Sequence, residues 1–214
     1  MPEYSSNYEA GWKQSFLANK VYVAVSAFYT RVNDAQVPTL IMPDAITITS
    51  NTGRMDSKGF EVEYVDHSFR NFRYEYRLGY TDAKFKNYKT STDNSTPDYT
   101  GNRQVFTPDV TSLLAAQYDL PVSKKLSVSL RGEWMYFGKQ YFYVANTIGQ
   151  SSYHLLNAKL GARYNNMELY FWMRNLTDTK YIDFAYDFGA VHLADPKTLG
   201  VTFRTKFFHH FRGR

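Results

Sequence analysis

The sequence predicts an all-β fold, an antiparallel transmembrane β-barrel segment of about nine long strands that follow one another as a meander. Three observations lead to this fold class. The segments alternate between apolar and polar residues, which is typical of strands with one apolar face. Each segment has roughly 9–12 residues, the length that crosses a bilayer at a tilt. Short connections alternate with long ones, as they do on the two sides of a membrane barrel.

Alternation predicts four strands in the first part of the chain. They are Tyr8–Phe16, Val21–Tyr29, Phe60–Tyr64 and Arg73–Tyr80. In the fourth, tyrosine or leucine at every second position is separated by charged residues or glycine. This period of two does not fit a helix. Short turns are expected at Leu17–Lys20 and Phe69–Asn71, and a long connection between the second and third strands.

Five further strands are predicted in the second part. They are Thr111–Leu120, Leu126–Tyr136, Leu156–Tyr164, Met167–Arg174 and Leu199–Phe207. Asn165-Asn166 is expected to form a two-residue hairpin turn, because asparagine tolerates positive φ. The stretch Lys84–Gln104 is interpreted as a polar loop and Gly138–Ser151 as an aromatic one.

The composition supports a strand-type membrane protein. The hydrophobic share is 43% and the mean hydropathy is −0.48, but lipid-facing residues occur only at every second position of a barrel strand. The aromatic share of 18% suits the two membrane interfaces, which tyrosine and tryptophan prefer. A soluble β-sandwich also alternates, but its strands are usually shorter, with a mode of about 5–6 residues.

The charge and the absence of cysteine exclude some functions. The chain has no cysteine, so that disulfide and thiolate chemistry are excluded. The net charge is +5, but lysine and arginine are spread along the chain rather than gathered in one stripe, which disfavours nucleic acid. Anionic headgroups of outer-membrane lipid and lipopolysaccharide are the expected partners of exposed basic loops.

One segment after the eighth predicted strand carries a recognisable motif. Asn175-Leu-Thr-Asp178-Thr-Lys-Tyr181 resembles the Asn-Leu-x-Asp-x-x-Tyr motif of TonB-dependent outer-membrane receptors. Asparagine and aspartate offer side-chain oxygens to the backbone where the strand breaks, and Tyr181 is expected to anchor the chain at the interface.

Further stretches resemble the same family, in the family's order. They are Asn7–Lys13, Asn51–Glu63 with Phe60 as a departure, Gly79–Ala83, Pro108 with Tyr118, and Leu199–Phe207. The last is similar to the signal that the barrel assembly machinery recognises, carried here by Gly200, Phe203 and Phe207. The resemblance implies a bacterial outer-membrane protein with a small-molecule ligand, no cofactor, and TonB acting through a plug domain.

The chain also departs from that family. The family has a plug, a TonB box and a barrel of roughly 22 strands, whereas about nine strands are predicted here. We therefore expect residues 1–207 to be the C-terminal part of such a barrel and 208–214 a short basic tail. The unpaired backbone groups of two edge strands cannot be satisfied in hydrocarbon, so we expect this chain to be a fragment of a transporter. By itself it should form an open curved sheet, or a sheet that is forced to close. Parity places the C-terminus on the short-turn, periplasmic side.

The outer loops hold the candidate ligand-binding residues. Arg103 and Lys197 could hold an anionic ligand. Seven aromatic residues could stack on a flat or aromatic one: Tyr141, Phe142, Tyr143, Tyr181, Phe184, Tyr186 and Phe188. The resemblance implies TonB-dependent uptake of a ferric siderophore, haem, cobalamin or a glycan. Packing within the loops and the interface is the alternative role for each of these aromatic residues.

Two other functions stay open at this point. One is a passive outer-membrane binding or adhesion barrel. The other is an outer-membrane hydrolase, for which His192 shares a loop with Asp183, and Ser152 shares a strand face with His154. A nucleophile and a base also need an orienting third group, and no histidine has metal-ligand spacing. We therefore expect no enzyme, no catalytic residue and no metal.

Overall fold

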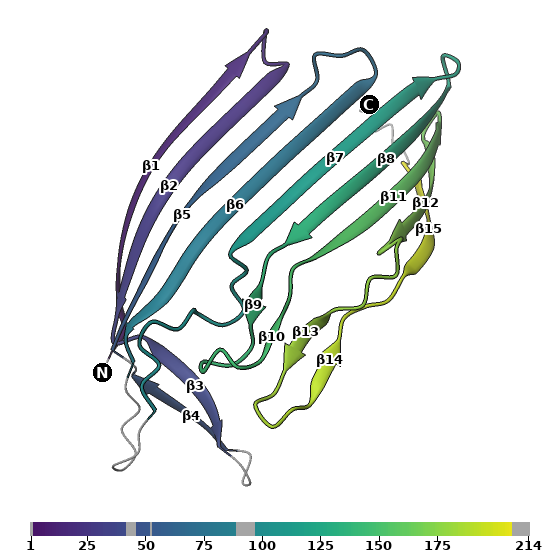
Figure 1. Ribbon diagram of the computed structural model, residues 1–214. Helices are drawn as coiled ribbons and strands as arrows, with labels where there is room; N and C mark the ends of the chain where they lie inside the picture. Colours follow the sequence, from purple (N-terminus) through teal and green to yellow (C-terminus); the bar gives the residue numbers. More distant parts are fainter. Residues whose placement is uncertain (1, 42–45, 52, 89–96, 207–214) are drawn as a thin grey trace, which may run out of the picture.

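The protein is built on one antiparallel sheet of nine strands. The computed structural model describes residues 2–41, 46–51, 53–88 and 97–206. Each strand of the main sheet pairs with the next in the chain (Figure 1). These strands are β1 (Tyr4–Phe16), β2 (Val21–Asn33), β5 (Arg54–Asp66), β6 (Phe72–Asn87), β7 (Val110–Pro121), β8 (Leu126–Phe137), β11 (Tyr153–Tyr164), β12 (Met167–Arg174) and β15 (Thr198–Thr205). The predicted nine-stranded meander is confirmed.

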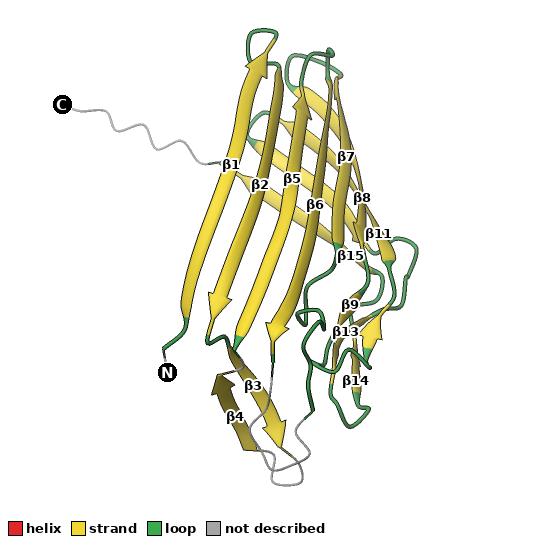
Figure 2. Cartoon of the chain, turned by 60° about the vertical axis from the view of Figure 1, so that its left-hand side comes forward, coloured by secondary structure: helices red, strands yellow, loops and turns green. Residues whose placement is uncertain are grey.

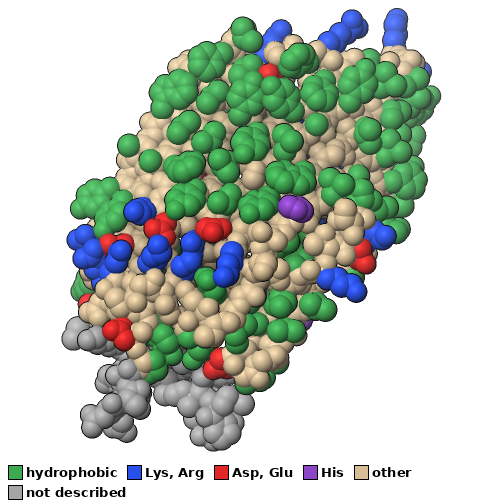
Figure 3. Space-filling model, in the orientation of Figure 1, with side chains coloured by type: hydrophobic (Ala, Val, Ile, Leu, Met, Phe, Trp, Pro, Cys, Tyr) green, Lys and Arg blue, Asp and Glu red, His purple; other side chains and the backbone are tan. Residues whose placement is uncertain are grey.

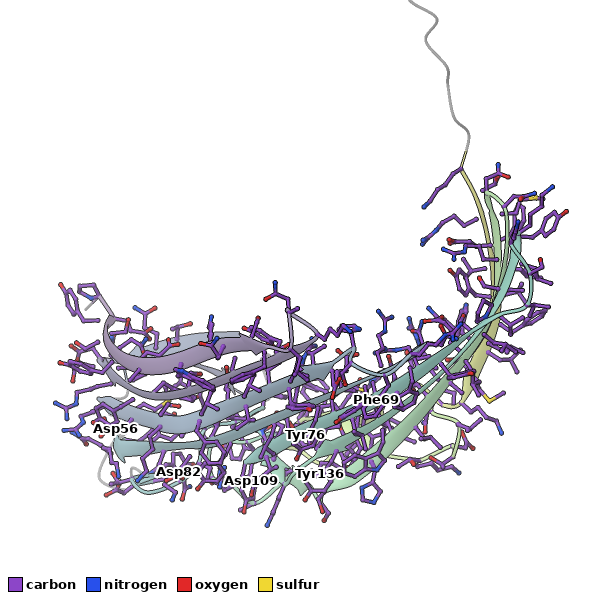
Figure 4. All side chains as sticks on the ribbon, turned by 90° about the horizontal axis from the view of Figure 1, so that it is seen from above. Asp56, Phe69, Tyr76, Asp82, Asp109 and Tyr136 are labelled. Carbon is purple, nitrogen blue, oxygen red and sulfur yellow. The ribbon has the colours of Figure 1, made fainter. Side chains whose placement is uncertain are left out.

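The sheet is strongly curved and remains open. In the described part of the chain β1 and β15 are its two edges, and each pairs with one neighbour only. Seen along the strands, the sheet forms part of a barrel wall with a concave and a convex face (Figure 4). The prediction of an open curved sheet is therefore confirmed.

Short turns and long connections lie at opposite ends of the strands (Figure 2). Three of the long connections contain a small hairpin that the sequence did not predict. The hairpins are β3 (Gln36–Ile41) with β4 (Ile46–Asn51), β9 (Gln140–Tyr141) with β10 (Gly149–Gln150), and β13 (Ile182–Ala185) with β14 (Val191–Leu193). Strands this short give too few alternations to be recognised. The end of β15 lies beside the 165–166 turn, since Lys206 N–H donates to the Asn166 carbonyl at 3.0 Å, so the strand ends on the short-turn side.

The prediction of a polar loop over Lys84–Gln104 is wrong at its beginning. Strand β6 continues to Asn87, and Phe85 and Tyr88 are 2% and 0% exposed. Both pack with Val144 of another connection, and Tyr99 packs edge-on against Tyr88. These apolar residues show no period along the sequence, because the small core that they form is assembled from several connections. The most polar stretch, 91–96, lies outside the described residues.

Alternation of side chains gives the sheet an apolar convex face. Leu130 pairs with Leu160 and Phe171 with Val201, so leucine, valine and aromatic side chains line up across the strands (Figure 3). Leu130 and Phe203 are 59% and 62% exposed. Soluble proteins rarely expose continuous apolar patches above a few hundred Å², so this face is suited to contact hydrocarbon.

No helix within the described residues is long and apolar enough to cross a membrane.

The concave face carries an ion-pair network that crosses several strands. Arg77 of β6 bonds Glu63 of β5 at 3.0 Å, and Arg131 of β8 bonds both Glu75 of β6 and Glu133 at 2.7 Å. Arg131 reaches Glu75 across β7. Ala115, which pairs with Glu75 on one side and Glu133 on the other, is 1% exposed beneath this contact. A small residue at this place leaves room for the guanidinium.

A charge introduced at the same depth on each face of the sheet should change the stability of the barrel by different amounts. Leu130→Arg places a guanidinium on the convex face, where it should destabilise the bilayer-inserted barrel by about 2–4 kcal/mol. Ser129→Arg, one residue away on the concave face, should change stability by less than about 1 kcal/mol. Urea unfolding in lipid vesicles measures both. Equal losses for the two variants would contradict the assignment of the faces.

Candidate functional site

Asn175 organises the connection between β12 and β15, residues 175–197. Its backbone has a φ of 49°, a left-handed conformation that asparagine tolerates. The side chain is buried, its Oδ1 accepts the Thr179 N–H at 2.8 Å, and its Nδ2 donates to the Thr179 carbonyl at 2.9 Å. Nδ2 also lies 3.3 Å from the Asp195 carbonyl. One amide therefore joins both ends of the 175–197 connection.

Asp178, three residues later, also uses its side chain to bond the backbone at the other end of the connection. It has a φ of 52°, and its Oδ1 accepts the Lys197 N–H at 2.9 Å. The Tyr181 carbonyl accepts the Ala194 N–H at 3.0 Å. The residues of the Asn-Leu-x-Asp-x-x-Tyr motif thus hold the connection closed at its base, and the β13–β14 hairpin projects from it (Figure 1).

Tyr181 is the last ring of an aromatic column at the loop end of the concave face. Its ring stacks on Tyr153 with centroids 4.2 Å apart, and Tyr153 stacks on Phe137 at 5.1 Å. Phe137 and Tyr153 pair directly across β8 and β11 and have the parity of the concave-face residue Glu133. Burial raises the pKa of Tyr181 above its ordinary value, and Asp183 and Asp195 raise it further.

A second row of rings, the aromatic stripe, joins three long connections. It consists of Phe142, Phe106, Phe184, Tyr186 and Phe188. The ring centroid of Phe106 lies 5.6 Å from those of both Phe142 and Phe184. The centroid of Tyr186 lies 4.8 Å from that of Phe184 and 5.0 Å from that of Phe188. Phe142 is buried and the other four rings are exposed, so the stripe offers stacking surface to a ligand.

Tyr141 and Tyr143 lie beside the stripe but in different surroundings. The Tyr141 carbonyl accepts the Phe106 N–H at 2.8 Å, and the Lys139 ammonium lies 4.8 Å from the Tyr141 ring. Tyr143 packs against the small core around Tyr88. Burial, with a hydrogen bond to Tyr99, raises the pKa of Tyr143 to about 12. Tyr141 is thus placed near the exposed rings, whereas Tyr143 supports the loops.

Arg103 is held by the connections that surround it. Its Nη2 donates to the Thr81 carbonyl at 3.1 Å, and its Nη1 lies 3.9 Å from an Asp109 oxygen. Its backbone N–H and carbonyl both bond the Asn146 side chain, at 2.7 and 3.0 Å. These contacts tie the β6–β7 connection to the β8–β11 connection.

Three rings of these two groups were missed by the sequence analysis. Phe106 has a φ of 54° in an irregular segment, and no pattern marks it as a site residue. Phe137 and Tyr153 carried a usable signal, because they continue the polar-face parity of Arg131 and Asn157. Aromatic residues on a polar face at the loop end are the feature that would have indicated them.

The two histidines considered for a hydrolase lie in different surroundings. His192 Nδ1 lies 2.6 Å from Asp183 Oδ1 across the β13–β14 hairpin, and both side chains are exposed. The ring centroid of His154 lies 6.0 Å from that of Trp134 and 5.8 Å from that of Tyr136. His154 is therefore part of a row of rings on the convex face. Among the described residues no group of His, Cys, Asp and Glu is placed to hold a metal ion.

The predicted assembly signal lies in the edge strand β15. Gly200 pairs with Trp172, and a Cβ on Gly200 would come within 2.3 Å of that indole, so only glycine fits under the ring. Phe203 is on the convex face. Phe207 lies outside the described residues.

Hydrogen exchange of the 175–197 connection tests the role of Asn175. Asn175→Ala leaves the backbone groups of Thr179 without their partners, which should cost about 1–3 kcal/mol locally and speed exchange of the Thr179 amide by roughly tenfold or more. Thr177→Ala is the control, because its hydroxyl bonds only the exposed Thr179 hydroxyl. Unchanged protection in Asn175→Ala would contradict this role.

The chain matches known proteins over most of its length. The family described as TonB dependent receptor-like, beta-barrel matches residues 1–176. A probable TonB-dependent siderophore receptor, PiuA of Acinetobacter baumannii, is 29% identical over 192 residues, which are 86% of this chain and 24% of that protein. The chain therefore spans about a quarter of this relative.

Solved structures agree with this match. The siderophore receptor PiuA from Acinetobacter baumannii has a TM-score of 0.71 and 27% identity, covering 92% of this chain and 27% of that one. The ferric yersiniabactin uptake receptor FyuA from Yersinia pestis shares the fold, with a TM-score of 0.80, 23% identity, and coverage of 96% and 30%. The chain belongs to the family of TonB-dependent receptors and corresponds to part of their β-barrel.

Proposed function

We propose that this chain forms part of the wall and outer loops of a bacterial outer-membrane receptor for TonB-dependent uptake of a ferric siderophore. The observation that carries the proposal is a sheet with an apolar convex face and aromatic loops, in a chain that is 29% identical to a probable TonB-dependent siderophore receptor. The family is one of receptors rather than enzymes. Haem, cobalamin and glycans are the other substrates that the resemblance allowed, and the siderophore is preferred because of this relative.

The orientation and partners follow from the same proposal. The short turns and the end of β15 face the periplasm, and the long connections face outward. The concave face, with the network around Arg131, covers a plug domain through which TonB acts. The barrel assembly machinery recognises the terminal strand through Gly200, Phe203 and Phe207.

The ligand contacts the outer loops on two groups of rings. Tyr181 offers the end of the aromatic column, and Tyr186 offers an exposed ring of the aromatic stripe, next to its last ring. Tyr141 adjoins the stripe. Tyr143 and Arg103 position the loops, and Arg103 adds a positive charge near an anionic ligand. Rings of this kind suit a flat or aromatic chelate.

Uptake of labelled iron tests the proposed function. Cells that lack their own receptors are given the receptor that contains this chain and a panel of ⁵⁵Fe-siderophores. We expect accumulation of at least one chelate that is lost in cells without TonB. Diffusion of small solutes through the reconstituted protein, with no TonB-dependent uptake of any chelate, would instead support a passive barrel.

Binding to single-residue variants tests the ligand contacts. Tyr186→Ala removes an exposed ring of the aromatic stripe and should weaken chelate binding by about 1 kcal/mol, or roughly fivefold. Tyr164→Ala, a ring of the convex face at the short-turn end, should leave binding unchanged. Fluorescence titration of the purified receptor measures both, and equal affinities for the two variants would refute a ligand role of the stripe.

A further inference from the structure

A groove follows β11 and β12 along the concave face, from the side of the long connections to the side of the short turns. Three adjoining hollows make up this groove. The first is lined by Asn157, Lys159, Trp172 and Arg174 among other residues. The second shares Lys159 with the first, and the third shares Arg163 with the second. The groove is therefore continuous over most of the length of these strands.

The register of the strands gives the direction of the groove. Asn157 lies two concave-face positions below Tyr153 of the aromatic column, a distance of about 13 Å along β11. Further down, Arg163 pairs with Glu168, and the 165–166 turn lines the last hollow. The groove thus begins beneath the outer rings and ends on the short-turn side of the sheet.

Four cationic side chains line the groove, and we name them the cation track. They are Arg174, Lys159, Arg163 and Lys206. All four residues are exposed. The Lys159 ammonium lies 4.6 Å from the Tyr170 ring centroid, and the Arg174 guanidinium carbon lies 5.3 Å from that of Trp172. A ring face attracts a cation without neutralising it, so the N–H donors of these groups stay available to an anion.

The carboxylates that line the groove are bonded to other groups. Glu133 bonds Arg131 Nε at 2.7 Å, and Glu168 Oε2 lies 3.6 Å from Arg204 Nη1. Asp119 accepts a hydrogen bond from a glutamine side chain at 2.9 Å. Within the described ranges, the ion pairs of these carboxylates thus go to arginines outside the cation track. Positive charge is in excess along this wall.

The concave wall formed by β1, β2 and β5 has the opposite balance of charge. Its hollow is lined by Glu9, Glu61 and Glu63, together with Lys13 and Arg77. Arg77 is bonded to Glu63 at 3.0 Å, which leaves a negative excess. A lining that is merely solvated needs no such separation of charge between two walls. The excess of cations on the β11–β12 side therefore points to an anion that moves or binds there.

We propose that the cation track is the path along which an anionic ferric chelate moves from the outer loops toward the periplasm. The proposal rests on the proposed function, because it takes the chain to be part of a receptor for such a chelate. An anion that leaves water loses hydration, and charge-assisted hydrogen bonds from the track replace part of it. Along the strands the first three cations are one or two concave-face positions apart, about 7–13 Å. Several exposed sites suit movement better than one tight site, because each site must also release the ion.

The kinetics of transport in cells test the cation track. Cells without receptors of their own are given the receptor that contains this chain, with two classes of ⁵⁵Fe chelate. One class is anionic, catecholates and carboxylates, and the other is uncharged trihydroxamates. Lys159→Gln/Arg163→Gln should lower the maximal rate of TonB-dependent uptake of anionic chelates by roughly fivefold or more. Uptake of uncharged chelates should not change, and neither should the affinity of the outer loops for the anionic chelate, measured by fluorescence titration.

Three further variants serve as controls. Lys159→Arg/Arg163→Lys keeps both charges and should retain the rate of the wild type. Lys13→Gln removes a cation from the opposite concave wall and should leave the rate unchanged. The single change Lys159→Gln, at an exposed side chain, should lower the rate in the same direction as the double variant. Heat-modifiable electrophoretic mobility shows that each variant is a folded barrel.

Three results would overturn the proposal. The first is an equal maximal rate for the wild type and Lys159→Gln/Arg163→Gln. The second is an equal loss for anionic and uncharged chelates, which would assign the groove to contact with the plug. The third is a matching loss in Lys13→Gln. A wild type that takes up only uncharged chelates would refute the cation track and leave the proposed function standing, whereas a wild type with no TonB-dependent uptake of any chelate would refute both.

Discussion

The structure depends on one constraint, which is that the backbone of a curved sheet is satisfied by strand pairing while the side chains of its convex face have no protein to pack against. Leu130, Leu160 and Phe203 are largely exposed, and water is an unfavourable surrounding for such a surface. Hydrocarbon removes this penalty and supplies no hydrogen-bond partners, so each inner strand must pair on both sides. The length of the strands, their alternation and the aromatic rows at the ends of the apolar face follow from these two demands.

Polar groups are gathered where that constraint is relaxed. On the concave face the pairs around Arg131 cross β7 over Ala115, so that charge is shared between strands. At the loop end, Asn175 and Asp178 replace strand pairing with side-chain hydrogen bonds to the backbone. Near the long connections, Asp56 on the convex face accepts hydrogen bonds from Tyr29 and Arg54. The strands, the long connections and the loop end of the convex face thus have separate chemistry on one sheet.

Much of the fold was predictable because period-two alternation is a local signal. Strand β8 shows it over its whole length, and its predicted range, Leu126–Tyr136, differs by one residue from the observed one. The predicted third strand began at Phe60, whereas β5 begins at Arg54, because Arg54, Asp56 and Lys58 interrupt the apolar pattern of the convex face near the long connections. The aromatic stripe and the small core around Phe85 and Tyr88 could not be predicted, since they are assembled from connections far apart in sequence. Parity would have placed Tyr153 on the concave face, but it says nothing of the ring that stacks on it.

The most direct test of the central claim is a cysteine scan along β8, which is possible because the chain has no cysteine of its own. Single cysteines from 126 to 136 in the receptor, in lipid vesicles, carry a fluorescent label that is exposed to a lipid-soluble and to a water-soluble quencher. The even positions should be quenched from the lipid and the odd positions from water, with a period of two. Absence of this period, or quenching of Leu130→Cys only by the water-soluble agent, would contradict the account.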